Sequence, residues 1–85
     1  MTATRGAALA DEDRLILDIE SKTFRYYGAK ERVIRERTGM LLRTYLVRLD
    51  RLLGDPAALE YAPAVVNRLR ARRERRERWE GGGGG

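Results

Sequence analysis

The chain has 85 residues, which fits a single domain and leaves about seventy for a core once its two ends are set aside. It contains no cysteine and no histidine, so disulfides, thiolate metal sites and the commonest general base are excluded. Its net charge is +5, and sixteen of the eighteen cationic residues are arginines, whose planar fork suits phosphates and guanine edges. This composition indicates a polyanionic partner, with an ordinary arginine-rich solvated surface as the alternative.

The positive charge is concentrated in the middle and in the C-terminal third. Residues 1–28 carry a net charge of −1, whereas residues 29–55 and 56–85 carry +3 each. No apolar stretch approaches the roughly twenty residues that span a bilayer, and no signal-peptide pattern precedes the acidic positions 11–13, so we expect a cytoplasmic protein without membrane contact. The chain has neither paired carboxylates nor a glycine-rich phosphate loop, and we expect no enzymatic activity, metal or cofactor.

Helix signals dominate the chain, and strand signals are missing. The pattern predicts an all-α fold, a small bundle of four to five helices. Residues 1–10 carry no strong pattern and residues 81–85 are all glycine, so both ends are expected to be flexible. The helical domain is therefore assigned to residues 11–80.

The first helix is predicted to run from Asp11 to Tyr27, with Gly28 ending it. Its acidic start is expected to supply an N-cap and to place negative charge where the helix dipole favours it, without any metal. Lys30, just beyond this helix, has no recognisable pocket context. The tyrosines are expected mainly in the core rather than as platforms for stacked bases: Tyr26, Tyr27, Tyr45 and Tyr61.

A second helix is predicted over residues 29–38, with Gly39 in the left-handed conformation after its last residue. A third helix should begin near Leu41 or Leu42 and end near Leu53, where a Gly-Asp-Pro sequence stops it.

Two helices joined by a short turn containing glycine are typical of a helix-turn-helix, here at residues 29–53. Ile34 and Tyr45 are expected to pin the two helices together, and Met40 to fill the buried position in the turn. Leu41 occupies the place where such motifs usually carry a Ser or Thr cap, and the lost cap costs about 1 kcal/mol.

In this interpretation the third helix enters the major groove of double-stranded DNA. Arg43 or Arg48 suits a bidentate contact to guanine, and Thr44 suits a phosphate or a thymine methyl. The full set expected on the outer side of this helix is Arg43, Thr44, Val47, Arg48 and Arg51. The second helix supplies arginines for backbone phosphates, namely Arg32, Arg35 and Arg37. A solvated charged face on a plain three-helix bundle is the alternative.

Residues 56–62 are predicted to form one or two helical turns, and Pro63 opens the last helix. Beyond Leu69 that helix has almost nothing apolar until Trp79, so its distal half should project into solvent or onto a partner. It is either a basic arm on phosphates or a solvated helix with Glu–Arg pairs, such as Glu77 with Arg73. The arginines that suit phosphates are Arg68, Arg72, Arg73 and Arg76. Trp79 is expected to dock on the same or a second chain.

Three stretches of the chain carry a resemblance to a known family. "YYGAKERVIRERTGM" from Tyr26, "RTYLVRLDRLLGDPAAL" from Arg43 and "PAVVNRLRARR" from Pro63 resemble a family of small uncharacterised actinobacterial proteins, over roughly residues 11–76. The resemblance implies a helix-turn-helix-like fold, and it brings no target, ligand or catalytic residue. That family usually has Ser after Gly-Met, where this chain has Leu41.

These observations lead to two hypotheses. The first is a DNA-binding transcriptional regulator or accessory factor associated with the nucleoid, acting as a symmetric homodimer or beside another DNA-bound protein. The second is a protein-interaction module whose arginines engage an acidic partner, for example in the transcription machinery, with Trp79 as an anchor. Binding to DNA should weaken steeply and log-linearly with salt, and a protein interface should respond weakly.

Overall fold

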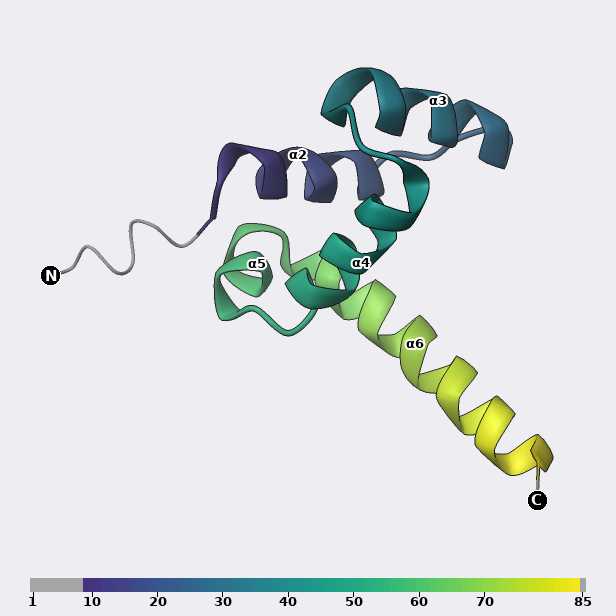
Figure 1. The fold of residues 1–85 in the computed structure, drawn as a ribbon. Coiled ribbons are helices and arrows are strands. Elements are labelled where there is room, and N and C mark those ends of the chain that lie inside the picture. Colours follow the sequence, from purple (N-terminus) through teal and green to yellow (C-terminus); the bar gives the residue numbers. More distant parts are fainter. Residues whose placement is uncertain (1–8, 85) are drawn as a thin grey trace, which may run out of the picture.

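The computed structural model describes residues 9–84, and the predicted all-α fold is confirmed for this part of the chain. Five helices follow one another along the sequence (Figure 1): α2 (Asp11–Glu20), α3 (Tyr27–Thr38), α4 (Leu42–Leu52), α5 (Pro56–Tyr61) and α6 (Pro63–Gly84). The expected flexibility of residues 1–8 lies outside the described residues. The bounds of α6 include Gly81–Gly84, and the flexibility of that run stays a prediction. None of the described helices combines the length and apolarity that crossing a membrane requires.

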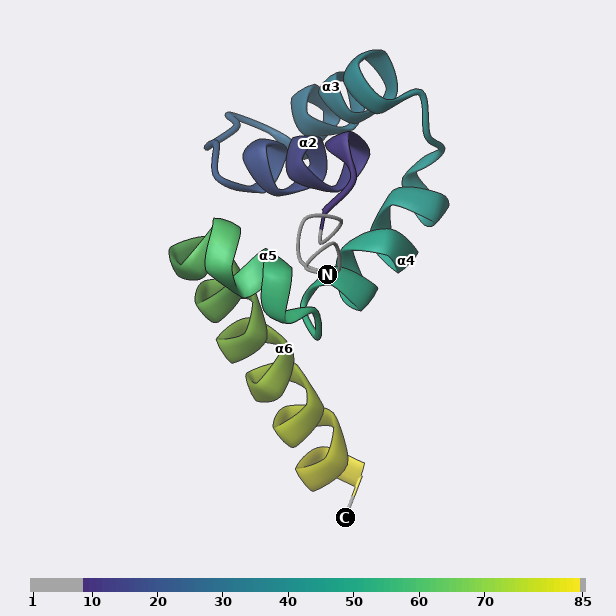
Figure 2. The same ribbon diagram turned by 90° about the vertical axis from the view of Figure 1, so that its left-hand side faces the viewer.

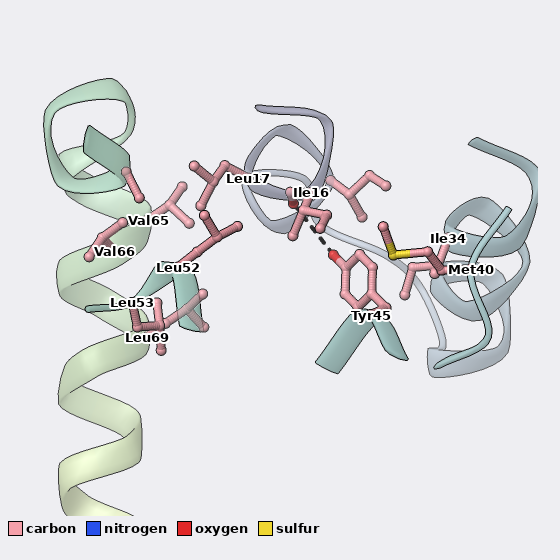
Figure 3. Packing of buried hydrophobic residues seen from close by; sticks show 12 residues of the cluster. Ile16, Leu17, Ile34, Met40, Tyr45, Leu52, Leu53, Val65, Val66 and Leu69 are labelled. Carbon is pink, nitrogen blue, oxygen red and sulfur yellow. Dashed lines mark hydrogen bonds between the residues drawn. The ribbon is translucent and has the colours of Figure 1, made fainter. Parts of the chain in front are cut away.

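The core is built around α2, which contacts α3, α4 and α5. Ile16 and Leu17 are both fully buried but point to different parts of the core (Figure 3). Ile16 lies on the side of the core formed by α3, the turn and α4, with Ile34, Met40 and Tyr45. Leu17 lies on the side formed by the end of α4 and by α6, with Leu52, Leu53, Val65, Val66 and Leu69. A short α2 therefore joins two groups of helices that lie on either side of it.

The prediction of a first helix from Asp11 to Tyr27 is wrong, because α2 ends at Glu20. The Ser21 hydroxyl donates a hydrogen bond to the Asp18 carbonyl at 2.6 Å, which offers the backbone an alternative to further helix. The acidic residues lie in the first turn of α2, and the N-cap is Ala10, whose side chain makes no cap. The predicted N-cap is therefore wrong, although the carboxylates remain at the favourable end of the helix dipole.

The segment after α2 also corrects the prediction for the tyrosines. Gly28 does not end a helix, because α3 begins at Tyr27. Tyr26 and Tyr27 are 66% and 55% exposed, and Tyr61 is exposed as well, so only Tyr45 of the four lies in the core. The apolar spacing that seemed to extend the first helix belongs to a loop and to the next helix.

The C-terminal elements agree with the sequence prediction. Asp55 caps α5 by accepting a hydrogen bond from the Ala57 amide at 2.9 Å, with Pro56 in the first turn. Pro63 opens α6, whose distal half extends away from the other helices (Figure 2). Trp79 is 79% exposed and therefore does not dock on its own chain.

Candidate nucleic-acid interface

The turn between α3 and α4 has the geometry expected from the sequence. Gly39 has φ 75°, and it is the only residue in the described part of the chain with a positive φ. Its amide donates to the Arg35 carbonyl at 2.9 Å, which closes the end of α3. Met40 is buried, as predicted, and Leu41 is the N-cap of α4 without any side-chain cap. The missing cap inferred from the sequence is thus confirmed.

Thr38 fixes this turn, and the sequence analysis did not identify it. Its hydroxyl donates to the Ile34 carbonyl at 2.6 Å and accepts a hydrogen bond from the Met40 amide at 3.0 Å. One side chain therefore joins the last turn of α3 to the residue after the glycine. A Thr immediately before the glycine was the signal available in the sequence.

The orientation of α4 is set by Tyr45, which is fully buried in the core. Its hydroxyl donates to Oε2 of Glu20 at 2.6 Å. The Ile16 carbonyl lies 3.4 Å from the same hydroxyl, a contact drawn as a dashed line in Figure 3. Oε1 of Glu20 accepts from Lys30 Nζ at 3.0 Å. Burial raises the pKa of Tyr45, and the hydrogen bond to Glu20 raises it further. The buried carboxylate thus joins α2, α3 and α4, and Lys30, for which no pocket context was expected, is one of its partners.

With Tyr45 and Leu52 turned inward, the opposite side of α4 faces solvent. Positions four apart on a helix share a face, so Arg43, Val47 and Arg51 form one stripe. All three side chains are exposed, and Thr44 lies exposed beside them. We call Arg43, Thr44, Val47 and Arg51 the α4 outer face. In the described residues α6 does not cover it, which is the arrangement that a reading helix requires.

Arg48 does not belong to this face, although the sequence analysis placed it there. Its guanidinium donates to Glu12 at 3.2 Å and to Asp13 at 3.1 Å, at the start of α2. The hydrogen bond to Asp13 raises the pKa of Arg48 above its ordinary value. Arg48 therefore holds α4 against α2 and neutralises two carboxylates beside the α4 outer face.

The three arginines expected to contact phosphates from α3 are exposed, but they do not share a side. Arg32 and Arg35 are three residues apart and line one shallow hollow with Glu31 and Glu36. Arg37 lies two residues further on, which turns it to a different side of the helix. The two acidic neighbours reduce the positive potential at the first pair, so Arg37 is the better placed of the three beside the turn.

Two arginines at the base of α6 have structural contacts that the sequence could not show. Arg68 donates to the Glu20 carbonyl at the end of α2, and Arg70 donates to the Leu53 carbonyl at the end of α4, each at 2.7 Å. Cations at helix C-termini satisfy free carbonyls and oppose the negative end of the helix dipole. Arg68, predicted to bind phosphate, is thus a cap for α2 in this structure.

The remaining phosphate candidates of α6 lie further along the helix. Arg73 pairs with Asp50 of α4 at 2.7 Å, where the sequence had predicted Glu77 as its partner. Arg72 and Arg76 are exposed and line a groove beside α4. The structure therefore brings together Arg43, Thr44, Val47 and Arg51 on one face, and the arginines of α6 line a separate groove beside it.

A scan of protein families matches residues 8–80 to the family described as "Protein of unknown function (DUF3263)". The match covers most of the chain, and the chain therefore belongs to this family. Searches of curated proteins and of solved structures found no match.

Proposed function

We propose that this member of the DUF3263 family binds double-stranded DNA through a helix-turn-helix formed by α3 and α4, in regulation of transcription. The observation that carries the proposal is the α4 outer face, which follows a glycine turn and is held outward by the buried side of its helix. The first residues of a reading helix are those that reach base edges, and Arg43 and Thr44 occupy that position.

Each residue of the α4 outer face has a role that fits its chemistry. Arg43 presents the fork that binds O6 and N7 of guanine, and Thr44 suits a phosphate or a thymine methyl. Val47 is 55% exposed, so its apolar side chain is available to meet an apolar group such as a thymine methyl. Arg51, one turn further along, and Arg37, beside the turn, suit the flanking phosphates.

One reading helix covers only a few base pairs, so specific binding is expected to need a second copy or another DNA-bound protein. In a homodimer, two α4 helices would meet half-sites about one turn of DNA apart. A DNA-bound protein of this kind would be found with the nucleoid.

The proposal is tested by selecting binding sites from a random duplex library and then measuring affinity by fluorescence anisotropy. The test variant is Arg43→Ala with Arg51→Ala, and the control is Arg75→Ala with Arg78→Ala, which removes the same charge from exposed positions on distal α6. We expect each lost contact to cost about 1–3 kcal/mol, or about 5- to 150-fold in affinity, and the preferred sequence to relax at the bases read by Arg43.

The control should keep the selected sequence and lose only the general electrostatic part of binding, which falls log-linearly with salt. Equal losses in both double variants, or a selection that enriches no sequence with the wild-type chain, would refute a reading role for the α4 outer face. Arg48→Ala is unsuitable as a test, because it also exposes two carboxylates beside the DNA.

A further inference from the structure

A second surface lies beside the α4 outer face, in a groove where α3, α4 and α6 meet. It has a volume of about 390 Å³. Its floor is aliphatic and comes from two helices and the residue that follows α4: Leu46, Leu49, Leu53 and Leu69. Leu46 is 46% exposed although it is a large apolar side chain. We call this feature the α4–α6 groove.

The rim of the groove is cationic. Lys30, Arg72, Arg73 and Arg76 line it together with the exposed ring of Tyr27. A neighbouring hollow of about 350 Å³ shares Lys30 and Arg72 and continues the positive surface along the loop between α2 and α3, adding Lys22, Arg25 and Arg68. The two hollows form one extended concave surface.

The carboxylates in this surface do not offset its charge. Only Glu20 and Asp50 line the two hollows, against seven cationic side chains. Glu20 is buried and bonded to Lys30 and Tyr45, and Asp50 is paired with Arg73. A ligand in the groove therefore meets excess positive charge around a strip of leucines.

We propose that the α4–α6 groove binds an acidic amphipathic helix of a partner protein, an interaction that goes beyond the DNA binding proposed above. Apolar side chains on one stripe of such a helix would lie on the leucine floor, and flanking carboxylates would meet Arg72, Arg76 and Lys30. The floor of the groove is aliphatic and accepts side chains such as Leu or Phe. The rings on which bases of single-stranded nucleic acid would stack, Phe24, Tyr26 and Tyr27, lie instead at the edge of the groove and in the neighbouring hollow. A second copy of this chain carries a net charge of +5, so like charge disfavours it as the occupant.

The groove adjoins the α4 outer face, because a shallow hollow on α4 is lined by residues of both, namely Leu42, Arg43, Leu46, Val47 and Asp50. Arg72 and Arg76 line the groove but not this hollow, which allows the two proposals to fail separately. Leu46, Leu49 and Leu53 lie at spacings of three and four, so they form their own stripe of α4 and its C-cap beside that of Arg43, Val47 and Arg51. Val47→Ala removes an exposed apolar side chain next to Leu46 but outside the groove. It is therefore the matched control for Leu46→Ala.

The test uses a fluorescein-labelled helical peptide of about 18 residues that carries leucines on one stripe and glutamates elsewhere. Two comparison peptides replace the leucines by alanine or the glutamates by glutamine. Arg72→Glu with Arg76→Glu should weaken binding of the first peptide by at least about tenfold, as should Leu46→Ala. Arg75→Glu with Arg78→Glu changes the same charge at exposed positions of α6 that do not line the groove. This double variant and Val47→Ala should stay within about threefold of the wild type.

Both comparison peptides should bind at least about tenfold more weakly than the first, because tight binding requires contacts to the leucine floor and to the cationic rim together. Equal binding of the alanine peptide would reduce the effect to charge and overturn the proposal. So would displacement of the leucine peptide by single-stranded oligothymidine at equal concentration, because it would identify the groove as a nucleic-acid channel. Circular dichroism of each variant, compared with wild type, establishes that a loss of binding does not reflect unfolding.

Discussion

Replacing Tyr45 by Phe tests whether the buried carboxylate of Glu20 holds α4 in place. The change removes one oxygen from a side chain that is fully buried, so it opens almost no cavity. It deletes the 2.6 Å hydrogen bond to Glu20 Oε2 and leaves that carboxylate with Lys30 as its remaining side-chain partner. A hydrogen bond to a charged group contributes about 1.5–3 kcal/mol, so we expect a loss of about 2 kcal/mol of unfolding free energy.

That loss is large for a chain of this size, whose total stability is on the order of 4–12 kcal/mol. It corresponds to a fall in Tm of about 8–16 °C, measurable by circular dichroism at the helical minimum. Tyr61→Phe is the control, because its hydroxyl donates to Asp18 at 2.9 Å from an exposed position, and solvent replaces that bond at little cost. A Tm drop for Tyr45→Phe no larger than that of Tyr61→Phe would refute the role assigned to the buried network.

A double-mutant cycle separates this bond from other effects of the substitution. Glu20→Gln keeps an acceptor for Tyr45 but removes the charge that also attracts Lys30. If the two groups act together, the double variant should be more stable than the sum of the single losses predicts, with a coupling of about 1 kcal/mol. Additive losses would mean that Tyr45 and Glu20 stabilise the fold independently.

Three further predictions concern the turn, the cap and alkaline pH. Gly39→Ala should lower the free energy of unfolding by about 1–2 kcal/mol, because the residue has a positive φ, although no atom lies within 4 Å of the added Cβ. The control is Gly28→Ala, which is equally open but helical and should raise that free energy by about 0.5–1 kcal/mol. Equal effects of the two substitutions in thermal unfolding would contradict the reasoning. Leu41→Ser should add an N-cap to α4 and so raise the unfolding free energy by about 1 kcal/mol. Little buried surface is lost, because the Leu41 side chain is 72% exposed. An unchanged Tm would show that the cap does not form. Burial raises the pKa of Tyr45 above the ordinary tyrosine value of about 10. The stability contributed by the protonated hydroxyl is therefore fully present below that value. It is lost by about 1.4 kcal/mol of unfolding free energy per pH unit as the pH rises above it. Urea titrations between pH 9 and 11 should show that the unfolding free energy falls less steeply with pH in Tyr45→Phe than in the wild type. An identical pH dependence in both proteins would contradict this prediction.

The sequence predicted the elements that depend on local signals. Gly39 sets the turn because its missing Cβ permits a positive φ, and Pro56 and Pro63 mark helix starts because each suits a first turn. Helix α2 ends at Glu20, where no glycine or proline in the sequence indicates a helix end. Apolar residues continue at helical spacing through Tyr27, and periodicity alone therefore extended the helix across a loop.

The site was harder to predict because its contacts are distant in sequence. Glu20 lies 25 residues before Tyr45, and Arg48 pairs with Asp13 from 35 residues away. A charged residue four positions after Ile16, on an apolar stripe, was the available sign that Glu20 is buried. No local pattern distinguishes Arg48, which pairs inward, from Arg43, which faces solvent.

The arginine content therefore overstates the positive charge available to a partner. Arg48 neutralises two carboxylates at the start of α2, and Arg73 pairs with Asp50. Arg68 caps the end of α2, and Arg70 caps the end of α4. The contacts of Arg68, Arg70 and Arg73 also fix the base of α6 against α2 and α4, so the direction in which α6 leaves the bundle is set by hydrogen bonds and an ion pair as well as by apolar packing. Because α4 is held on both edges, its outer face and the α4–α6 groove keep a constant relation to each other. A partner bound in the groove would therefore be presented at a fixed position beside any DNA bound by the outer face, which is how a chain with one reading helix gains specificity from a second protein.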